Sequence, residues 1–204
     1  RFSDILSQSH LTSSSLLSAV MDALCKMDLL RKSNPINDET SKQKTFYALT
    51  DNAFSFYYRY LFLHKSARNV MNAEDFYETY IAQDFETKFV PAAFERIARQ
   101  YLIRKNKAGA IKPHFLAIGS YWYDDPKTKQ NGQFDVVGKK EKGYVFYEVK
   151  FREKPLADNL IQEEAAQIVK THLPVASLGF FSRSGYALKK SYPYIFYTLE
   201  DLYK

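Results

Sequence analysis

The chain has 204 residues, of which 46% are hydrophobic and 25% charged, enough for one large domain or two small ones with apolar cores. No apolar run approaches the ~20 residues that a membrane-spanning helix needs, no signal peptide is visible, and one cysteine, Cys25, excludes an internal disulfide or cysteine-based zinc site. The net charge of +6 lies mostly in residues 65–204, a mild basic excess compatible with nucleic acid, so we expect a soluble, cytoplasmic protein without a membrane partner.

Residues 1–64 predict a winged helix. Residues 2–8 and 12–28 are typical of two helices, and the second opens with residues suited to an N-cap and repeats apolar residues every three or four positions. Residues 29–33 and 44–50 are typical of strands, with a polar turn between them. Two helices followed by a two-stranded wing is the order of a winged-helix domain.

The polar side chains of this module do not favour base-specific DNA binding. A recognition helix needs Arg, Lys, Asn or Gln to reach base edges and phosphates. The candidate helix offers Lys26 beside two aspartates, and in the wing Lys42 and Lys44 are offset by two acids. We therefore expect a structural or interdomain role, with DNA reading as the alternative.

An aromatic helix follows over residues 51–62, DNAFSFYYRYLF. Aromatic side chains cover nearly its whole circumference, and a helix that is apolar all round is usually buried on several sides. A linker packed between two domains is the interpretation we prefer. A base-stacking surface is the alternative, and Arg59 is the one basic residue here.

The second domain is expected over residues 65–204, beginning with helices at 73–85 and 91–103. Residues 96–112 hold six basic residues and no acid. Its members Arg99, Arg104 and Lys105 are candidate phosphate contacts, although a solvated helix end explains the same run about as well. Glu95 lies one turn before Arg99 on the second helix.

The chemistry is predicted on a hairpin of strands at 133–137 and 144–151. Side chains alternate along a strand, so Glu148 and Lys150 point to the same side. A solvent-facing ion pair explains these two charges alone. Asp135, 13 residues before Glu148 and on the partner strand, favours convergence of all three at one end of the sheet.

This combination suits metal-dependent phosphodiester hydrolysis. A hard cation, Mg²⁺ or Mn²⁺, polarises phosphate and lowers the pKa of an attacking water, and it prefers oxygen ligands. Asp135, Glu148 and the carbonyl of Val149 would hold the cation. Lys150 would orient the water or stabilise charge in the transition state, and Glu95 is a further carboxylate.

The remaining elements continue an alternation of helix and strand. We expect a helix at 158–171, strands at 175–181 and 194–199, and between these strands a turn leading to a short helix. Gln162, on the first turn of the helix, is placed to approach the site, and capping is an equally good explanation.

A helix with Glu95, then Phe134–Asp135, then Glu148, Val149 and Lys150 resembles the PD-(D/E)XK nuclease superfamily. The whole chain resembles the C-terminal region of archaeal-type AAA+ ATPases, through segments such as ALTDNAFSFYYRYLF, QFDVV, YVFYEVKF and GFFSRSGY. There a winged helix precedes a nuclease-like domain of unknown function.

The resemblance implies an α/β (α+β) fold: a winged helix, then a restriction-endonuclease-like domain with a central mixed sheet flanked by helices. It also implies an ATPase module upstream, the site roles given above, and a nuclease role for Gln162. One departure is Gln133, where the family commonly has an acid.

A metal-dependent nuclease domain acting on DNA is therefore the function we expect. An inactive nuclease fold that assembles or regulates the ATPase is the alternative. A winged-helix transcription factor is disfavoured by the poor recognition helix. Assembly with further copies of the chain remains open.

Overall fold

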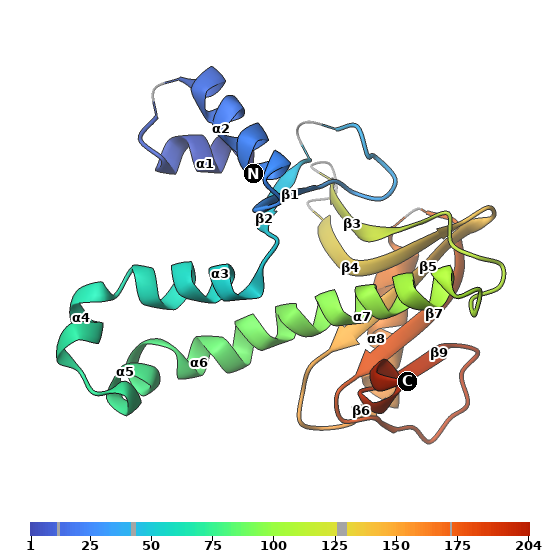
Figure 1. The fold of residues 1–204 in the computed structure, drawn as a ribbon. Helices are drawn as coiled ribbons and strands as arrows, with labels where there is room; N and C mark the ends of the chain where they lie inside the picture. The colour runs from blue at the N-terminus through green and yellow to red at the C-terminus, as the bar shows by residue number, and fades with distance from the viewer. Residues whose placement is uncertain (12, 42–43, 126–129, 172) are drawn as a thin grey trace. The chain divides into compact units, whose positions relative to one another are not determined.

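The computed structural model describes residues 1–11, 13–41, 44–125, 130–171 and 173–204. The chain forms two compact units (Figure 1): unit 1 comprises residues 1–34 and 38–89, and unit 2 comprises residues 35–37 and 90–204. The boundary expected after residue 64 falls inside unit 1. No helix in the described part of the chain is long and apolar enough to cross a membrane.

Unit 1 begins with the predicted order of two helices and a hairpin. Ser13 caps the second helix by accepting a hydrogen bond from the backbone N–H of Leu16 at 3.2 Å. Thr12 and Lys42 lie outside the described residues. The elements are α1 (Phe2–Gln8), α2 (Ser14–Lys26), β1 (Leu30–Ser33) and β2 (Phe46–Leu49), with β1 and β2 antiparallel.

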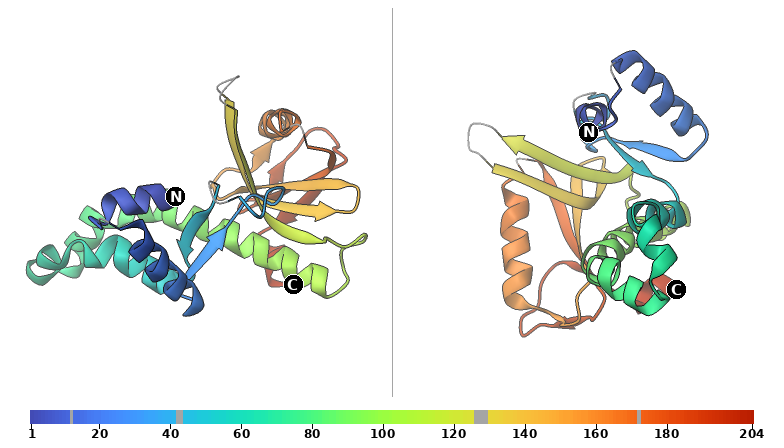
Figure 2. Two further views of the ribbon diagram at one scale, coloured as in Figure 1. Left: turned by 90° about the horizontal axis from the view of Figure 1, so that it is seen from above. Right: turned by 90° about the vertical axis from the view of Figure 1, so that its left-hand side faces the viewer.

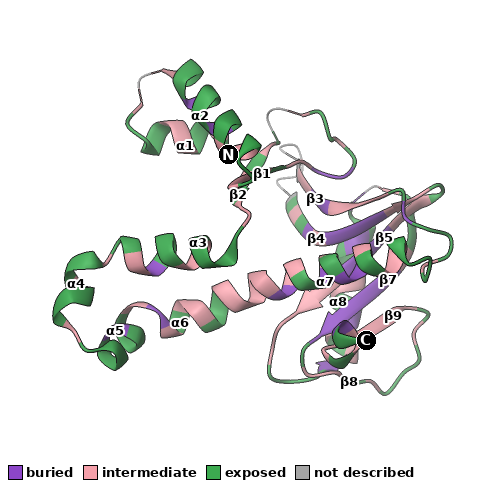
Figure 3. Cartoon of the chain, viewed as in Figure 1, coloured by how far each residue is buried: buried purple, intermediate pink, exposed green. Residues whose placement is uncertain are grey.

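The predicted aromatic helix forms, and its second half is π-helical. The elements of this part are α3 (Asn52–Phe56), η1 (Tyr57–Phe62), α4 (Lys65–Val70), α5 (Ala73–Tyr80), α6 (Ala82–Asp84) and a second π-helical segment, η2 (Phe85–Phe89). Tyr60, Phe76 and Ile81 are buried in one apolar cluster, while Phe54 and Tyr58 are exposed. This mixture of buried and exposed positions is visible along α3 to α6 in Figure 3.

A polar contact joins η1 to Asp84, the last residue of α6, within unit 1. Arg59 donates from Nε and Nη2 to the two carboxylate oxygens of Asp84 at 2.6 and 2.9 Å, and the Tyr60 hydroxyl donates to the same carboxylate at 2.6 Å. Burial and this carboxylate raise the pKa of Tyr60 to about 12. These contacts explain why residues 65–89 belong with the aromatic helix and not with the second unit.

Unit 2 is built on a five-stranded mixed sheet of order β3-β4-β5-β7-β9. The first three strands are antiparallel neighbours, and β5, β7 and β9 are parallel. The elements are α7 (Val90–Lys107), β3 (Ala117–Asp125), β4 (Gln130–Lys140), β5 (Gly143–Lys150), β6 (Leu156–Ala157), α8 (Asp158–Val169), β7 (Val175–Ser182), β8 (Tyr186–Ala187), β9 (Ile195–Thr198) and the 3₁₀ helix η3 (Glu200–Tyr203).

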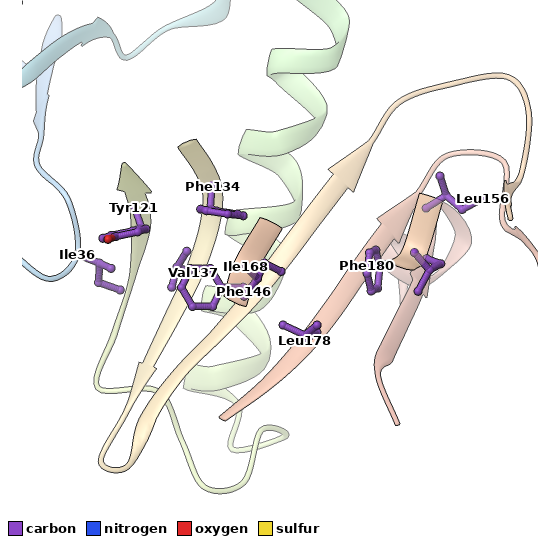
Figure 4. Close-up of a cluster of buried hydrophobic side chains, with 10 residues drawn as sticks. Ile36, Tyr121, Phe134, Val137, Phe146, Leu156, Ile168, Leu178 and Phe180 are labelled. Atoms are coloured by element: carbon purple, nitrogen blue, oxygen red, sulfur yellow. The ribbon is translucent and has the colours of Figure 1, made fainter. Parts of the chain in front are cut away.

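The two long helices of unit 2 cover opposite faces of the sheet (Figure 2). Alternation along β5 places Phe146 in the cluster that includes Ile161 and Ile168 of α8 (Figure 4). Its neighbours Val145 and Tyr147 belong to the cluster that includes Phe94 and Leu102 of α7. The expected central mixed sheet flanked by helices is therefore confirmed.

One expected element is wrong. The segment between β7 and β9 contains the short strand β8, paired with β6, and no helix. Gly185 adopts a φ of +74° there, and Tyr186 donates its hydroxyl to the carbonyls of Phe180 and Tyr197. These tertiary contacts hold the segment extended, and the short helix η3 follows β9 instead.

Candidate functional site

Lys150, at the end of β5, is bound by two carboxylates. Its Nζ lies 2.7 Å from Glu148 Oε1 and 2.7 Å from Oε1 of Glu164, a residue of α8. The lysine side chain is 31% exposed and the two glutamates 18% and 14%. The prediction that Glu148 and Lys150 share one side of the strand is confirmed.

Burial shapes the charges of this cluster. Loss of solvent raises the pKa of Glu148 to about 7, against the attraction of Lys150, and the carboxylate of Glu164 adds to the rise. Burial alone would lower the pKa of Lys150, but the charges and hydrogen bonds of the two glutamates outweigh it and raise that pKa. Lys150 is therefore held firmly in its charged form.

Asp135 lies at a bulge in β4. Gly119 of β3 is opposite Val137, but Tyr121 is opposite Phe134, so β4 contains one extra residue between these pairs. A bulge re-aims the side chains beside it. On the other side of β4, Val136 is opposite Tyr147 of β5, which brings Asp135 level with Glu148 in the antiparallel register.

Arg99 of α7 holds this bulge in place. Its Nη2 donates to the carbonyl of Asp135 at 2.5 Å and to Ser120 Oγ at 2.5 Å, and Ser120 Oγ in turn donates to the same carbonyl at 2.9 Å. The side chain of Asp135 accepts a hydrogen bond from Gln133 at 2.7 Å. Arg99, predicted as a phosphate contact, thus makes contacts inside unit 2 that fix the backbone of Asp135.

Glu95 of α7 belongs to the same electrostatic cluster. Burial raises its pKa to about 7, and the charges of Asp135 and Glu148 add to the rise, while Arg99 opposes it. The two acids that the sequence placed on the hairpin therefore interact with the helix carboxylate. Glu95, Asp135, Glu148 and Lys150 form what we call the acidic site.

The residue of α8 that reaches the acidic site is Glu164, not Gln162. Gln162 is exposed and donates to the Tyr192 hydroxyl at 3.3 Å. Glu164 lies on the helical face of the buried Ile161 and Ile168, three and four residues away. A charged residue on an apolar helix face was the sequence signal that could have identified it.

Arg104 and Lys105 lie elsewhere in unit 2, and the side chain of Val149 lies on the other side of β5 from its neighbours Glu148 and Lys150. Arg104 donates to the carbonyl of Leu202 at 3.1 Å, and both Arg104 and Lys105 stand over the ring of Tyr101. Val149 packs against the α7-side cluster. Within the residues that the structure describes, no three His, Cys, Asp or Glu side chains form a group that would hold a metal ion.

Unit 2 is thus an α+β unit whose mixed sheet brings acidic side chains together around one half-buried lysine. The chain belongs to the DUF234 family, described as archaea bacterial proteins of unknown function, whose model matches residues 57–168. It is also similar to an uncharacterized protein of Methanocaldococcus jannaschii, MJECL04, with 26% identity over 141 residues. That match covers 67% of this chain and 29% of MJECL04, so the chain spans less than a third of this relative. No solved structure matches the chain.

Proposed function

We propose that unit 2 is a metal-dependent nuclease domain of the PD-(D/E)XK type that cleaves DNA phosphodiester bonds. The observation that supports this best is the electrostatic interaction of Glu95 with Asp135 and Glu148, with Lys150 bound to Glu148 at 2.7 Å. Metal-dependent phosphodiester cleavage needs carboxylates and a cationic side chain close together. Here they are a carboxylate on a helix, an acid on one strand, and an acid and a lysine two residues apart on the next strand.

The donor set suits Mg²⁺ or Mn²⁺ by its chemistry. The acidic site offers carboxylate oxygens, which such cations prefer. Mutual repulsion adds to the raised pKa values of Glu95 and Glu148, and a divalent cation would relieve it. Asp135 and Glu148, with the carbonyl of Val149, would hold the cation, which would polarise the phosphate and lower the pKa of a bound water.

The chain's own residues would then orient the reaction. Lys150, kept charged by its two glutamates, would donate to the attacking water or to the phosphate oxygen that gains charge. Glu95 would accept a proton or a hydrogen bond at the same place. Arg99 would keep the carbonyl of Asp135 fixed, so that the carboxylate approaches from a constant direction.

Unit 1, in this proposal, is a winged-helix module with a structural role, and the chain is the C-terminal part of an AAA+ ATPase-type protein. Two hairpin lysines are already engaged: Lys32 pairs with Asp22 at 2.8 Å and Lys44 with Asp38 at 3.1 Å. Basic side chains paired in this way are less available to DNA phosphates. This supports the structural role over base-specific reading.

A cleavage assay tests the proposal. The wild-type chain is incubated with branched, single-stranded and duplex DNA, with Mg²⁺ or Mn²⁺ and with a chelator, beside Asp135→Asn and Glu163→Gln. Glu163 is an exposed residue of α8 and serves as the control. We expect cation-dependent cleavage of at least one DNA form by the wild type and Glu163→Gln, and none by Asp135→Asn. Equal cleavage by all three proteins, or none by the wild type, would contradict the proposal.

A second candidate is an inactive nuclease fold that acts as an interaction or regulatory module. The double ion pair of Lys150 favours it, because Glu148 and Glu164 each have a cationic partner within the fold. Under this alternative the wild type cleaves no DNA form, and divalent cations leave the unfolding temperature of the chain unchanged.

A further inference from the structure

Arg183 lies beside the acidic site at the end of β7. Ser182, the last residue of that strand, is opposite Lys150 in the parallel register, and the backbone N–H of Arg183 donates to the carbonyl of Lys150 at 3.1 Å. Its side chain is exposed and has no ion pair with any described residue. Arg183, a cation, thus lies one residue beyond the paired ends of β5 and β7, next to Lys150.

The Arg183 side chain stacks on one aromatic ring, and a second ring packs against the first. Its guanidinium carbon lies 4.6 Å from the centre of the Phe151 ring, and Phe151 in turn meets Phe94 of α7, with ring centres 5.4 Å apart. Phe94 immediately precedes Glu95. Phe151 belongs to the cluster on the face covered by α7, the helix that carries Glu95, whereas Lys150 pairs with Glu164 of α8. A guanidinium stacked on a ring keeps its N–H groups free to donate.

The backbone around Arg183 is also fixed. Ser184 Oγ donates to the carbonyl of Arg152 at 2.6 Å, Ser182 Oγ donates to the carbonyl of Gly185 at 2.8 Å, and the N–H of Leu156 donates to that same carbonyl at 3.0 Å. The Ser184 and Leu156 bonds join the segment after β7 to the segment after β5, and the Ser182 bond closes the turn after β7. The position of Arg183 relative to Lys150 is thus set by the fold.

The charge of the acidic site calls for such a cation. Glu148 and Glu164 contact the ammonium group of Lys150, and Glu95 and Asp135 interact electrostatically with Glu148. The site therefore has an excess of acidic groups, and positive charge beside it would favour the approach of a phosphodiester. Lys150 is already paired with two glutamates. Arg183 is a neighbouring cation that is exposed and has no ion pair with any residue that the structure describes.

We infer that Arg183 binds a backbone phosphate of the DNA next to the scissile one, so that the nucleic acid passes over the ends of β5 and β7. This inference rests on the proposed nuclease function and names its contact surface. It differs from the expectation that the basic run at 96–112 supplies the phosphate contacts, since Arg99 and Arg104 both donate to backbone carbonyls within unit 2.

Binding without cleavage tests the inference. Anisotropy of a fluorescein-labelled DNA, duplex and single-stranded in turn, is measured in a chelator at several salt concentrations for the wild type, Arg183→Gln, Arg183→Lys and Lys140→Gln. Lys140 is the matched control, because it is also a cation that stacks on an aromatic ring. Its Nζ lies 5.3 Å from the centre of the Phe115 ring, and Lys140 itself is at the hairpin between β4 and β5. Circular dichroism checks that each variant folds.

We expect Arg183→Gln to weaken binding about 10-fold and to reduce the slope of log affinity against log salt by about 1. Arg183→Lys should keep the slope and lose part of the affinity, because a point charge replaces the fork of donors. Lys140→Gln should match the wild type.

Equal effects of Arg183→Gln and Lys140→Gln would overturn the inference and, if the wild type still cleaves DNA, would leave the nuclease proposal intact. Absence of any DNA binding by the wild type would overturn the inference and the DNA partner together.

Discussion

Replacing Glu95 with Gln should stabilise the protein at alkaline pH. The carboxyl group is partly buried and faces the charges of Asp135 and Glu148, so its ionised form is disfavoured in the folded state. Because its folded-state pKa is raised, the group favours folding at low pH, and this contribution is lost as the pH rises through about 7. Gln is neutral at every pH and avoids this loss.

The magnitude follows from the rise in the pKa of Glu95 from 4.5 to about 7. For a carboxyl group without solvent screening, this rise in pKa corresponds to a loss of about 3 kcal/mol in the free energy of unfolding above neutral pH. Solvent screening of a partly exposed carboxylate reduces the expected gain to about 1–2 kcal/mol at pH 8. At pH 4.5 the gain should be close to zero, since the folded wild type still holds the proton there.

Urea unfolding at pH 4.5 and pH 8 measures this gain. Fluorescence of Trp122, the single tryptophan of the chain and a residue of β3, reports on unit 2. Glu163→Gln, which removes an exposed carboxylate of α8, is the control and should change little at either pH. If Glu95→Gln shows no more gain at pH 8 than this control, the carboxylate cluster around Glu95 does not exist in solution.

Three further changes test the packing around the site. Glu164→Gln replaces one of the two carboxylates that pair with the site lysine by a neutral amide and should cost about 1–2 kcal/mol in the free energy of unfolding. An unchanged urea midpoint would refute that ion pair. Arg99→Lys removes the Nη2 group that donates to both Ser120 Oγ and the carbonyl of Asp135 and, because the lysine side chain is shorter, should cost about 1–3 kcal/mol; a neutral result would mean that the β4 bulge does not depend on Arg99. Gly179→Ala would place a Cβ 2.4 Å from the ring of Tyr147, while Gly119→Ala meets its nearest atom at 3.5 Å. Thermal unfolding should therefore show a loss of about 1–3 kcal/mol for the first and little change for the second, and equal effects would contradict the packing.

Local patterns were enough to predict the main elements of both units. The apolar spacing of residues 12–28 and the alternation of residues 144–151 led to α2 and β5. The same alternation predicted that Glu148 and Lys150 lie together, which the 2.7 Å ion pair confirms. Both inferences need only the spacing of apolar and polar residues within a single helix or strand.

Features that depend on contacts between distant elements were not predictable in this way. The β4 bulge depends on how β3 and β4 pair, and a shift of one residue in register is invisible in either strand alone. Gln162 and Glu164 are two residues apart and therefore lie on opposite sides of α8, so the choice between them depends on which side faces the sheet. The inclusion of residues 65–89 in the first compact unit likewise depends on a distant contact, because Asp84 bonds back to Arg59.

Calorimetric titration with Mn²⁺ in the absence of DNA tests most directly whether Asp135 and Glu148 form a cation site. Wild type, Asp135→Asn, Glu148→Gln and the control Glu163→Gln are compared at one pH. The account predicts saturable binding to the wild type and to Glu163→Gln, and loss of most of that binding in Asp135→Asn and Glu148→Gln. Binding of equal strength in all four proteins, or none in the wild type, would contradict the account.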